Sequence, residues 1–298
     1  MKIAAVLTFI LTVFVVLWGA LVRATHSGAG CGAHWPLCNG DVVPLAPSIE
    51  TFIEFTHRIT SGFSALVVFL MLIVTFCNFP RGTFVRSAIF HASVFMLVEV
   101  GIGASLVLYG WVLYDSSVSR AVMVAFHLIN SFLLVGTLSV YVWTMLYHQE
   151  KLLKGFLLMA GSLGDKFLFV VFLMVGSAGA VTALGDTLFP ALSLLEGIRE
   201  DFSRDSHFLV QLRVIHPVLA ILLSVFLLNE VSGNFNIKGK IGYLSKIISG
   251  AVALQVFLGT ATVLLLAPVY LQIFHLFISL VIWSLFVFYV TEKELVYR

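Results

Sequence analysis

Residues 119–147 read SRAVMVAFHLINSFLLVGTLSVYVWTMLY, a stretch in which Arg120 is the only acidic or basic side chain apart from one histidine. A helix that crosses a bilayer core needs about 20 such apolar residues. Continuously apolar runs favour helices over the alternating strands of a membrane barrel. Similar runs predict eight spans, at 3–22, 49–77, 84–108, 119–147, 166–184, 208–230, 241–266 and 270–290. The sequence therefore predicts an all-α integral membrane protein with eight transmembrane helices.

The composition of the 298 residues supports this class. Apolar residues make up 60% of the chain and charged residues only 11%, whereas an average soluble domain is about one quarter charged. This excludes a soluble globular fold, and 27 phenylalanines exclude a disordered chain. A net charge of +2 without a basic stripe indicates no nucleic-acid partner. The expected environment is a lipid bilayer.

The lysines predict how the chain is oriented. With a cytoplasmic N-terminus, every lysine falls on the cytoplasmic side, as the positive-inside rule requires. The C-terminus is then cytoplasmic too, and the long loops 23–48 and 185–207 face outward. The first apolar run ends without an evident cleavage site, so we expect a helix rather than a signal peptide.

The two halves of the chain repeat. EVGIGASLVL at 99–108 matches QVFLGTATVL at 255–264, and FHL occurs at both 126–128 and 274–276. Four spans per half bring both halves into the membrane from the same side, which makes the repeat parallel. We predict one four-helix bundle over residues 1–147 and a second over residues 166–298. A cytoplasmic connection over residues 148–165 joins them.

Four of the nine histidines occupy equivalent places in this repeat: His57, His127, His216 and His275. Their depths follow from the expected helix starts, which are marked by Ser48, Ser119, Ser206 and Pro268. The histidines lie 9, 8, 10 and 7 residues beyond these markers, or about 10–15 Å below the outer surface. Pairs of them can therefore face each other across the core of a bundle.

Two imidazoles on facing helices of a bundle commonly hold haem iron. Zinc or copper would call for further Cys, Asp or Glu ligands, and only Glu54 is near in sequence. Alternatively, each histidine makes an interhelical hydrogen bond, which suits one isolated histidine better than four matched ones. The pattern predicts two bis-histidine haem sites, one in each half, with both toward the outer face.

The halves differ beside the histidines. Glu54 precedes His57 by three residues and lies on the same helix face, whereas Arg213 holds the matching place in the second half. A carboxylate at one site only indicates that this site carries out chemistry, unless Glu54 merely pairs with Arg58. Arg58 and Arg213 are candidate partners for haem propionates. Glu99, whose repeat counterpart is a glutamine, is interpreted as an interhelical hydrogen-bonding position.

Two cysteines lie in the first outer loop, within GAGCGAHWPLCNG at 28–40. The outer face is the oxidising side of the membrane, so we expect a disulfide between Cys31 and Cys38. It either pins the loop or exchanges with other thiols; a metal site that includes His34 is the less favoured alternative. Cys77, at the cytoplasmic end of its span, is expected to be a free thiol.

The GxGC…WPLC loop, the ExxHR motif at 54–58 and the single histidines of spans four, six and eight resemble haem A synthases. Members of that family oxidise the C8 methyl group of haem O to a formyl group, giving the haem A of terminal oxidases. The resemblance implies roles for seven residues: His57 and His127 as ligands of the substrate haem, His216 and His275 as ligands of a permanent haem b, Glu54 as the catalytic carboxylate, and Cys31 with Cys38 as a disulfide. His34 stands where the family would have an acidic residue.

Two other classes compete with this interpretation. A di-haem electron-transfer protein, of the quinol-linked cytochrome b type, usually places its haems on opposite sides of the membrane. A transporter with parallel repeats would need polar residues along a central pathway. A haem O synthase that delivers the substrate is a candidate partner. The sequence leaves open the electron donor or acceptor, the source of the formyl oxygen and the oligomeric state, a homo-oligomer included.

Overall fold

The computed structural model describes residues 1–149 and 161–297, and its regular structure is helical. The helices are α1 (Lys2–Ala24), α2 (Ile49–Asn78), α3 (Phe84–Leu108), α4 (Val118–Tyr147), α5 (Leu163–Leu188), α6 (Leu194–Asp201), α7 (Phe208–Gln211), η2 (Leu212–Val214), α8 (Ile215–Ser232), α9 (Lys240–Leu264) and α10 (Val269–Tyr297). Eight segments are long and apolar enough to cross a membrane, with α7, η2 and α8 forming one of them. The predicted all-α fold with eight spans is confirmed.

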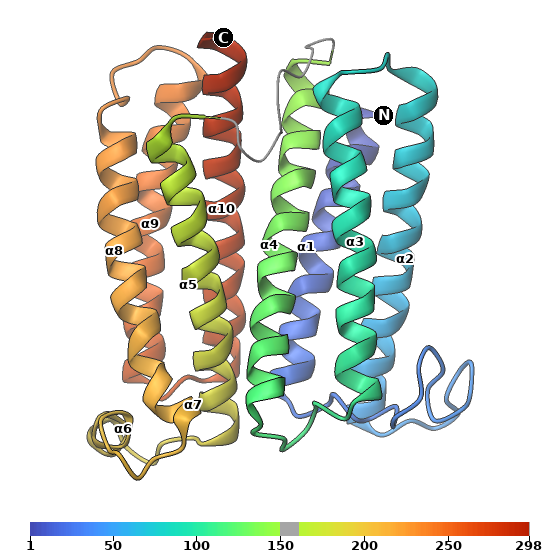
Figure 1. Ribbon diagram of the computed structural model, residues 1–298, viewed down its shortest axis with the longest axis vertical. Coiled ribbons are helices and arrows are strands. Elements are labelled where there is room, and N and C mark those ends of the chain that lie inside the picture. The colour runs from blue at the N-terminus through green and yellow to red at the C-terminus, as the bar shows by residue number, and fades with distance from the viewer. Residues whose placement is uncertain (150–160, 298) are drawn as a thin grey trace.

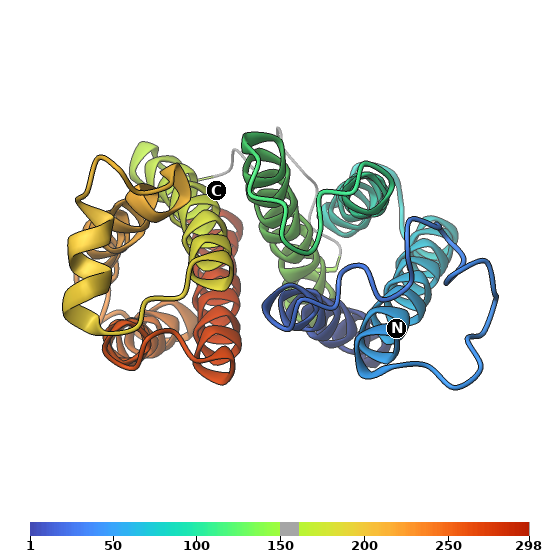
Figure 2. The same ribbon diagram turned by 90° about the horizontal axis from the view of Figure 1, so that it is seen from below.

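The helices form two bundles that stand side by side, α1–α4 in one and α5 with α8–α10 in the other (Figures 1 and 2). Helices α1 and α5 run in the same direction, so the repeat is parallel. Both termini lie at one end of the molecule, while the loop after α1 and the short helix α6 lie at the other (Figure 1). Which end faces the cytoplasm stays a prediction. Most of the predicted linker, residues 150–160, lies outside the described residues.

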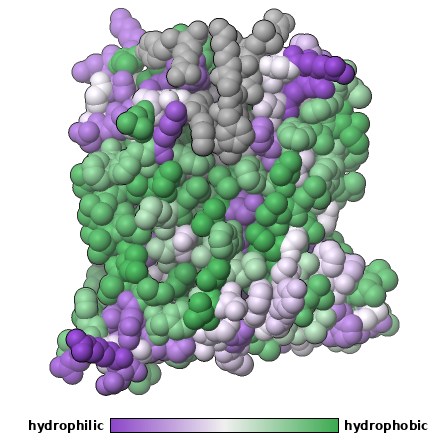
Figure 3. Space-filling model, in the orientation of Figure 1, coloured by the Kyte–Doolittle hydropathy of each residue, from purple (hydrophilic) through white to green (hydrophobic). Residues whose placement is uncertain are grey.

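The surface of the bundles suits a bilayer. Figure 3 shows hydrophobic side chains covering the middle of one face, with hydrophilic side chains gathered toward its two ends. An apolar belt between polar ends is the surface that a lipid core requires, since lipid cannot hydrogen-bond to polar groups. The protein is thus a multi-pass membrane protein.

Polar contacts join the two bundles at three depths. Arg23 on α1 donates to the backbone and a side chain of α5. Near the middle, the indole of Trp283 on α10 donates to the carbonyl of Phe132 on α4, at 2.7 Å. Toward the termini, the indole of Trp143 on α4 donates to the carboxylate of Glu292 on α10, at 2.8 Å. These bonds in an apolar interior hold the bundles in one arrangement.

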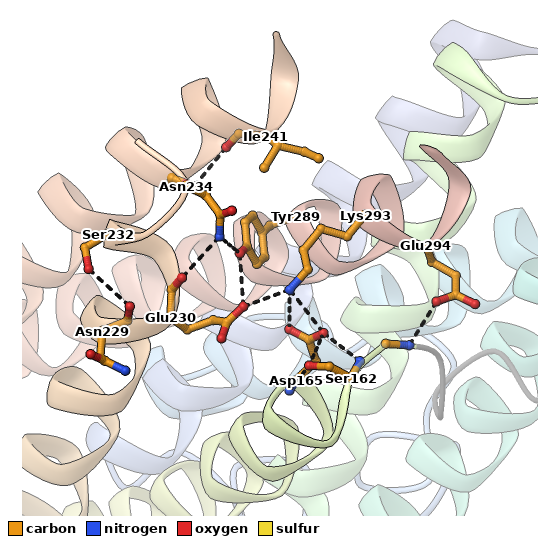
Figure 4. Close-up of polar contacts among 12 residues, drawn as sticks. Ser162, Asp165, Asn229, Glu230, Ser232, Asn234, Ile241, Tyr289, Lys293 and Glu294 are labelled. Carbon is orange, nitrogen blue, oxygen red and sulfur yellow. Dashed lines mark hydrogen bonds and ion pairs between the residues drawn. The ribbon is translucent and has the colours of Figure 1, made fainter. Parts of the chain in front are cut away.

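A network of charged side chains joins three helices of the second bundle, at the end of the molecule where the termini lie (Figure 4). The ammonium of Lys293 on α10 contacts Asp165 on α5 at 3.1 Å and Glu230 on α8 at 2.8 Å. Asp165 also completes a capping box with Ser162 at the start of α5. Three helices are therefore fixed to one another through a single ammonium group.

Two of the predicted helix starts are wrong. Ser48 does cap α2, but α4 is capped by Ser117 rather than Ser119, because the Ser117 hydroxyl accepts from the backbone of Arg120. The sixth span is capped by His207 instead of Ser206, since the imidazole accepts from the backbone N–H that follows two residues later. The short helix α6 (Leu194–Asp201), in the loop between α5 and α7, was not predicted.

Candidate functional site: two pairs of histidines

The four repeat histidines come from α2, α4, α8 and α10 and lie at similar depths. Each follows the first residue of its span by six to nine positions, which corresponds to about 9–14 Å from the end that carries the cysteine loop. All four side chains are partly accessible rather than packed in the core. Because these imidazoles are only partly covered by their neighbours, each has room for a ligand beside it.

The second bundle brings two of these imidazoles face to edge. The rings of His216 and His275 have centroids 6.2 Å apart and planes at 80°. His216 Nδ1 lies 3.1 Å from the carbonyl oxygen of Val175 on α5. A backbone carbonyl that accepts from Nδ1 leaves Nε2 with a free electron pair, which is how metal-binding histidines are usually oriented. Gln255 on α9 approaches His275, with its amide nitrogen 3.0 Å from Nε2.

The first bundle places a carboxylate beside its pair. His127 Nδ1 lies 3.4 Å from Glu99 Oε1 on α3. His57 is close enough to both groups for direct electrostatic interaction. The Nδ1 atoms of His57, His127 and His275 are buried without a hydrogen-bond partner among the described residues. A buried polar atom without a hydrogen-bond partner raises the free energy of the folded state. A bound ligand or a small rotation of the ring would give these nitrogens a partner.

Glycines on neighbouring helices seat three of the four rings, and we call them the glycine seats. A Cβ built on Gly179 would lie 2.9 Å from His216, closer than Cβ atoms are found in proteins. A Cβ on Gly19 would lie 3.0 Å from His57 and one on Gly259 3.1 Å from His275, both tighter than ordinary van der Waals contact. Sequence reasoning missed these residues, although Gly19 and Gly179 hold the same place in the repeat. Each seat lets a helix backbone press on the ring and fix its position.

The cysteine loop is closed by the predicted disulfide between Cys31 and Cys38. Both cysteines are buried, with 0% and 1% of their surface exposed. Thiol–disulfide exchange requires access to the sulfur atoms, so this burial favours a structural role over exchange. The joined sulfurs do not form the alternative metal site. Cys77 is a free, exposed cysteine, as predicted.

Glu54 and Arg58 hold this loop against α2. The carboxylate of Glu54, 3% exposed, accepts from the backbone N–H of Cys31 at 2.8 Å and pairs with the Arg58 guanidinium at 2.5 Å. Arg58 also donates to the carbonyls of His34 and Leu37. The pairing with Arg58 that was an alternative for Glu54 is therefore present. The catalytic role of Glu54 and the propionate role of Arg58 remain predictions.

Arg213 lies where the sixth span changes its hydrogen bonding. Pro217 has no N–H to donate to the carbonyl of Arg213, and the preceding turn is a 3₁₀ helix, η2. The guanidinium donates to backbone carbonyls of α5 and pairs with Asp186 at 3.2 Å and Asp201 at 3.7 Å. Burial raises the pKa of the Asp201 carboxyl, while Arg213 opposes that rise. A propionate role for Arg213 stays a prediction.

The donor set fits haem better than a bare metal ion. Within residues 1–149 and 161–297, no three His, Cys, Asp or Glu side chains cluster so that they could hold a metal ion. Zinc sites built by proteins usually take three or four such ligands, whereas haem iron needs only one or two because the porphyrin supplies the rest. Two pairs of imidazoles, three of them seated on glycines, suit the ligation of haem iron.

Fold and site together define a polytopic membrane protein with paired imidazoles in two repeated bundles. Residues 2–287 match the family described as cytochrome oxidase assembly protein, and the chain belongs to that family.

Individual relatives refine this assignment. The chain is 41% identical over 284 residues to the Protoheme IX farnesyltransferase of Thermus thermophilus, a match that covers 94% of this chain but only 46% of that protein. It is 39% identical over 110 residues to the Heme A synthase of Alkalihalophilus pseudofirmus, covering 37% of each chain. The Heme A synthase of an Exiguobacterium species is 41% identical over 95 residues, 32% of each chain. The resemblance to haem A synthases is confirmed, although the chain spans less than half the length of the Thermus protein.

Proposed function

We propose that this protein is a haem A synthase, which oxidises the C8 methyl group of haem O to a formyl group. The observation that carries the proposal is the pairing of four histidines in two bundles that differ in their acidic residues. A pure electron carrier needs only the iron ligands. The carboxylates of Glu54 and Glu99 are both in the first bundle, which supports a chemical role for that bundle.

In this proposal the two pairs have different tasks. His57 and His127 bind and orient the substrate haem O, while His216 and His275 hold a permanent haem b. Haem iron supplies redox chemistry that side chains cannot. The glycine seats fix three of the imidazoles, so the rings are positioned before the porphyrin arrives, which lowers the cost of ordering the site. Both sites lie toward the outer face of the bacterial cell membrane.

Glu54 is proposed to serve the oxidation itself. Converting a methyl group to a formyl group takes one oxygen atom from water or O₂ and passes electrons to an acceptor outside this chain, and it releases protons while positive charge builds on the reacting carbon. A carboxylate one helical turn from His57 can stabilise that charge or accept a proton. Its contacts to Arg58 and to the N–H of Cys31 fix where the carboxylate lies. The disulfide loop therefore helps to position the proposed catalytic group.

The Thermus relative suggests where the substrate comes from. That protein is named a Protoheme IX farnesyltransferase, and more than half of it lies outside the match to this chain. We propose that an enzyme with the farnesyl-transferring activity in that name makes the substrate of the present chain. For the present chain, a separate haem O synthase would then supply haem O as a partner.

The test is to express the chain in a bacterium that makes haem O but no haem A, and to separate the extracted haems by chromatography. We expect haem A with the natural sequence. Glu54→Gln is expected to bind both haems yet make little haem A, whereas Glu50→Gln, an exposed carboxylate one turn earlier on α2, should leave production unchanged. Haem B and haem O alone with the natural sequence would overturn the proposal and favour an electron-transfer cytochrome. Near-normal haem A with Glu54→Gln would reject its catalytic role.

A further inference from the structure

The repeat keeps a polar side chain beside one histidine of each bundle but changes its charge. In the first bundle, Glu99 Oε1 lies 3.4 Å from His127 Nδ1. In the second, the equivalent residue is Gln255, and its amide nitrogen lies 3.0 Å from His275 Nε2. The repeat position is thus a carboxylate that faces Nδ1 of the histidine in the first bundle and a neutral amide that faces the other ring nitrogen, Nε2, in the second.

Glu99 is held toward α4 by two further side chains of that helix. The amide of Asn130 donates to Glu99 Oε2 at 2.6 Å and also to the carbonyl of Phe95 at 2.9 Å, so it bonds to two groups of α3. The hydroxyl of Ser131 donates to Glu99 Oε1. Asn130 and Ser131 are buried, with 5% and 4% of their surface exposed. The carboxylate is therefore ordered by α4 and presented to the histidine of that helix.

In the second bundle, the side chain at the equivalent position is uncharged. Ser279 stands four residues after His275, as Ser131 stands after His127, but it contacts Gln255. His127 also has no glycine seat. Gly103 is the counterpart of Gly259, but a Cβ built on it would have no described atom within 4 Å. The ring of His127 faces a carboxylate at 3.4 Å, whereas the ring of His275 lies against a glycine seat and an amide.

A carboxylate that accepts from Nδ1 of a metal-binding histidine fixes the tautomer with Nε2 free and makes the imidazole a stronger electron donor. A charged acceptor does this more strongly than a neutral one. The separation of 3.4 Å is a few tenths of an ångström beyond an ordinary N–H···O bond, so a small rotation of the ring closes it.

We infer that Glu99 is a positioning residue for the haem of the first bundle. Its carboxylate would orient His127 and strengthen it as an electron donor to iron, so that haem held in the first bundle would have the lower reduction potential of the two. This inference rests on the proposed function, because it requires haem at both pairs. In this inference, the substrate site and the haem b site differ in whether a charged side chain lies beside an iron-binding histidine.

The test measures reduction potentials, which a merely structural role would not move selectively. The purified protein is loaded with ferric haem B at both sites, and the midpoints are determined by spectroelectrochemical titration. His127→Ala identifies which midpoint belongs to the first bundle. Glu99→Gln is expected to raise that midpoint and leave the other unchanged. Asn130→Ala, which removes a side chain that holds Glu99 toward α4, is expected to raise the same midpoint by a smaller amount.

Two results would overturn the inference: an unchanged first midpoint in a haem-loaded Glu99→Gln protein, or a shift confined to the second haem. If Glu99→Gln binds no haem, Asn130→Ala still decides, since an unmoved first midpoint in that variant contradicts the proposed effect of the carboxylate. Failure of the proposed function looks different. In that case His127→Ala would lose no haem and a single type of site, or none, would titrate.

Discussion

Replacement of Gly179 by alanine tests how the second bundle positions its haem ligand. The new Cβ would lie 2.9 Å from His216 Cε1 and 3.1 Å from Nδ1, whereas carbon atoms in contact are ordinarily about 3.5–4.0 Å apart. The ring must therefore move by roughly half an ångström or more. Because Nδ1 is bonded to the carbonyl of Val175 at 3.1 Å, that movement strains the bond that orients Nε2.

The magnitude follows from the cost of overpacking, about 1–3 kcal/mol. At about 1.4 kcal/mol for each tenfold change, haem b should bind Gly179→Ala roughly 5- to 150-fold more weakly. Helix stability should not fall in the same way, because alanine favours a helix over glycine by up to about 1 kcal/mol. The expected result is thus a protein that unfolds at a similar temperature but loses haem.

The assay is a haem titration of the purified protein, followed by absorbance, together with thermal unfolding without added haem. Gly250→Ala on α9 is the matched control, since nothing in the described part of the chain lies within 4 Å of the added Cβ. It should gain helix stability and keep its haem affinity. If Gly179→Ala binds haem b as tightly as Gly250→Ala does, the glycine seat has no role in positioning His216.

Two further predictions concern the ends of the molecule. Cys31 and Cys38 should resist maleimide until a reductant is added, while Cys77 reacts at once because it is free and exposed; rapid labelling of all three would contradict the disulfide. Lys293→Met should destabilise the fold by up to about 3 kcal/mol, because the carboxylate of Asp165, 1% exposed, loses its counter-charge. Thermal unfolding measures this, and Asp165→Asn in the same protein should recover part of the loss; no recovery would show that the charge is not the cause.

The sequence was sufficient for the eight spans, because apolar length is a local property that each segment carries by itself. It was insufficient for the caps of α4 and α7. In DSSVSR, Ser117 and Ser119 are both suitable capping residues, and the choice is made by Asp115, whose side chain accepts from the backbone N–H of Ser117. The hydrophobic pattern of the sequence does not reveal which of two nearby polar side chains caps a helix.

The paired histidines were predicted because the repeat displays them, but their surroundings depend on how the helices are rotated and how closely they pack. Gly259 and Glu99 belong to the repeat motif, yet nothing in one sequence places them against a ring on the next helix. Arg23 is a similar case. Its guanidinium reaches α5 and Gln272 on α10 across the junction of the bundles, and the sequence of its own span does not predict that contact.

The central claim is that the histidines form two separate haem sites with different occupants, and haem content tests it most directly. The four histidine-to-alanine variants are purified, and the haem extracted from each is identified and counted per protein. His216→Ala and His275→Ala are expected to lose haem b. His57→Ala and His127→Ala are expected to retain haem b and to lose haem O and haem A. Equal loss of haem b from all four variants would contradict the division between the two bundles.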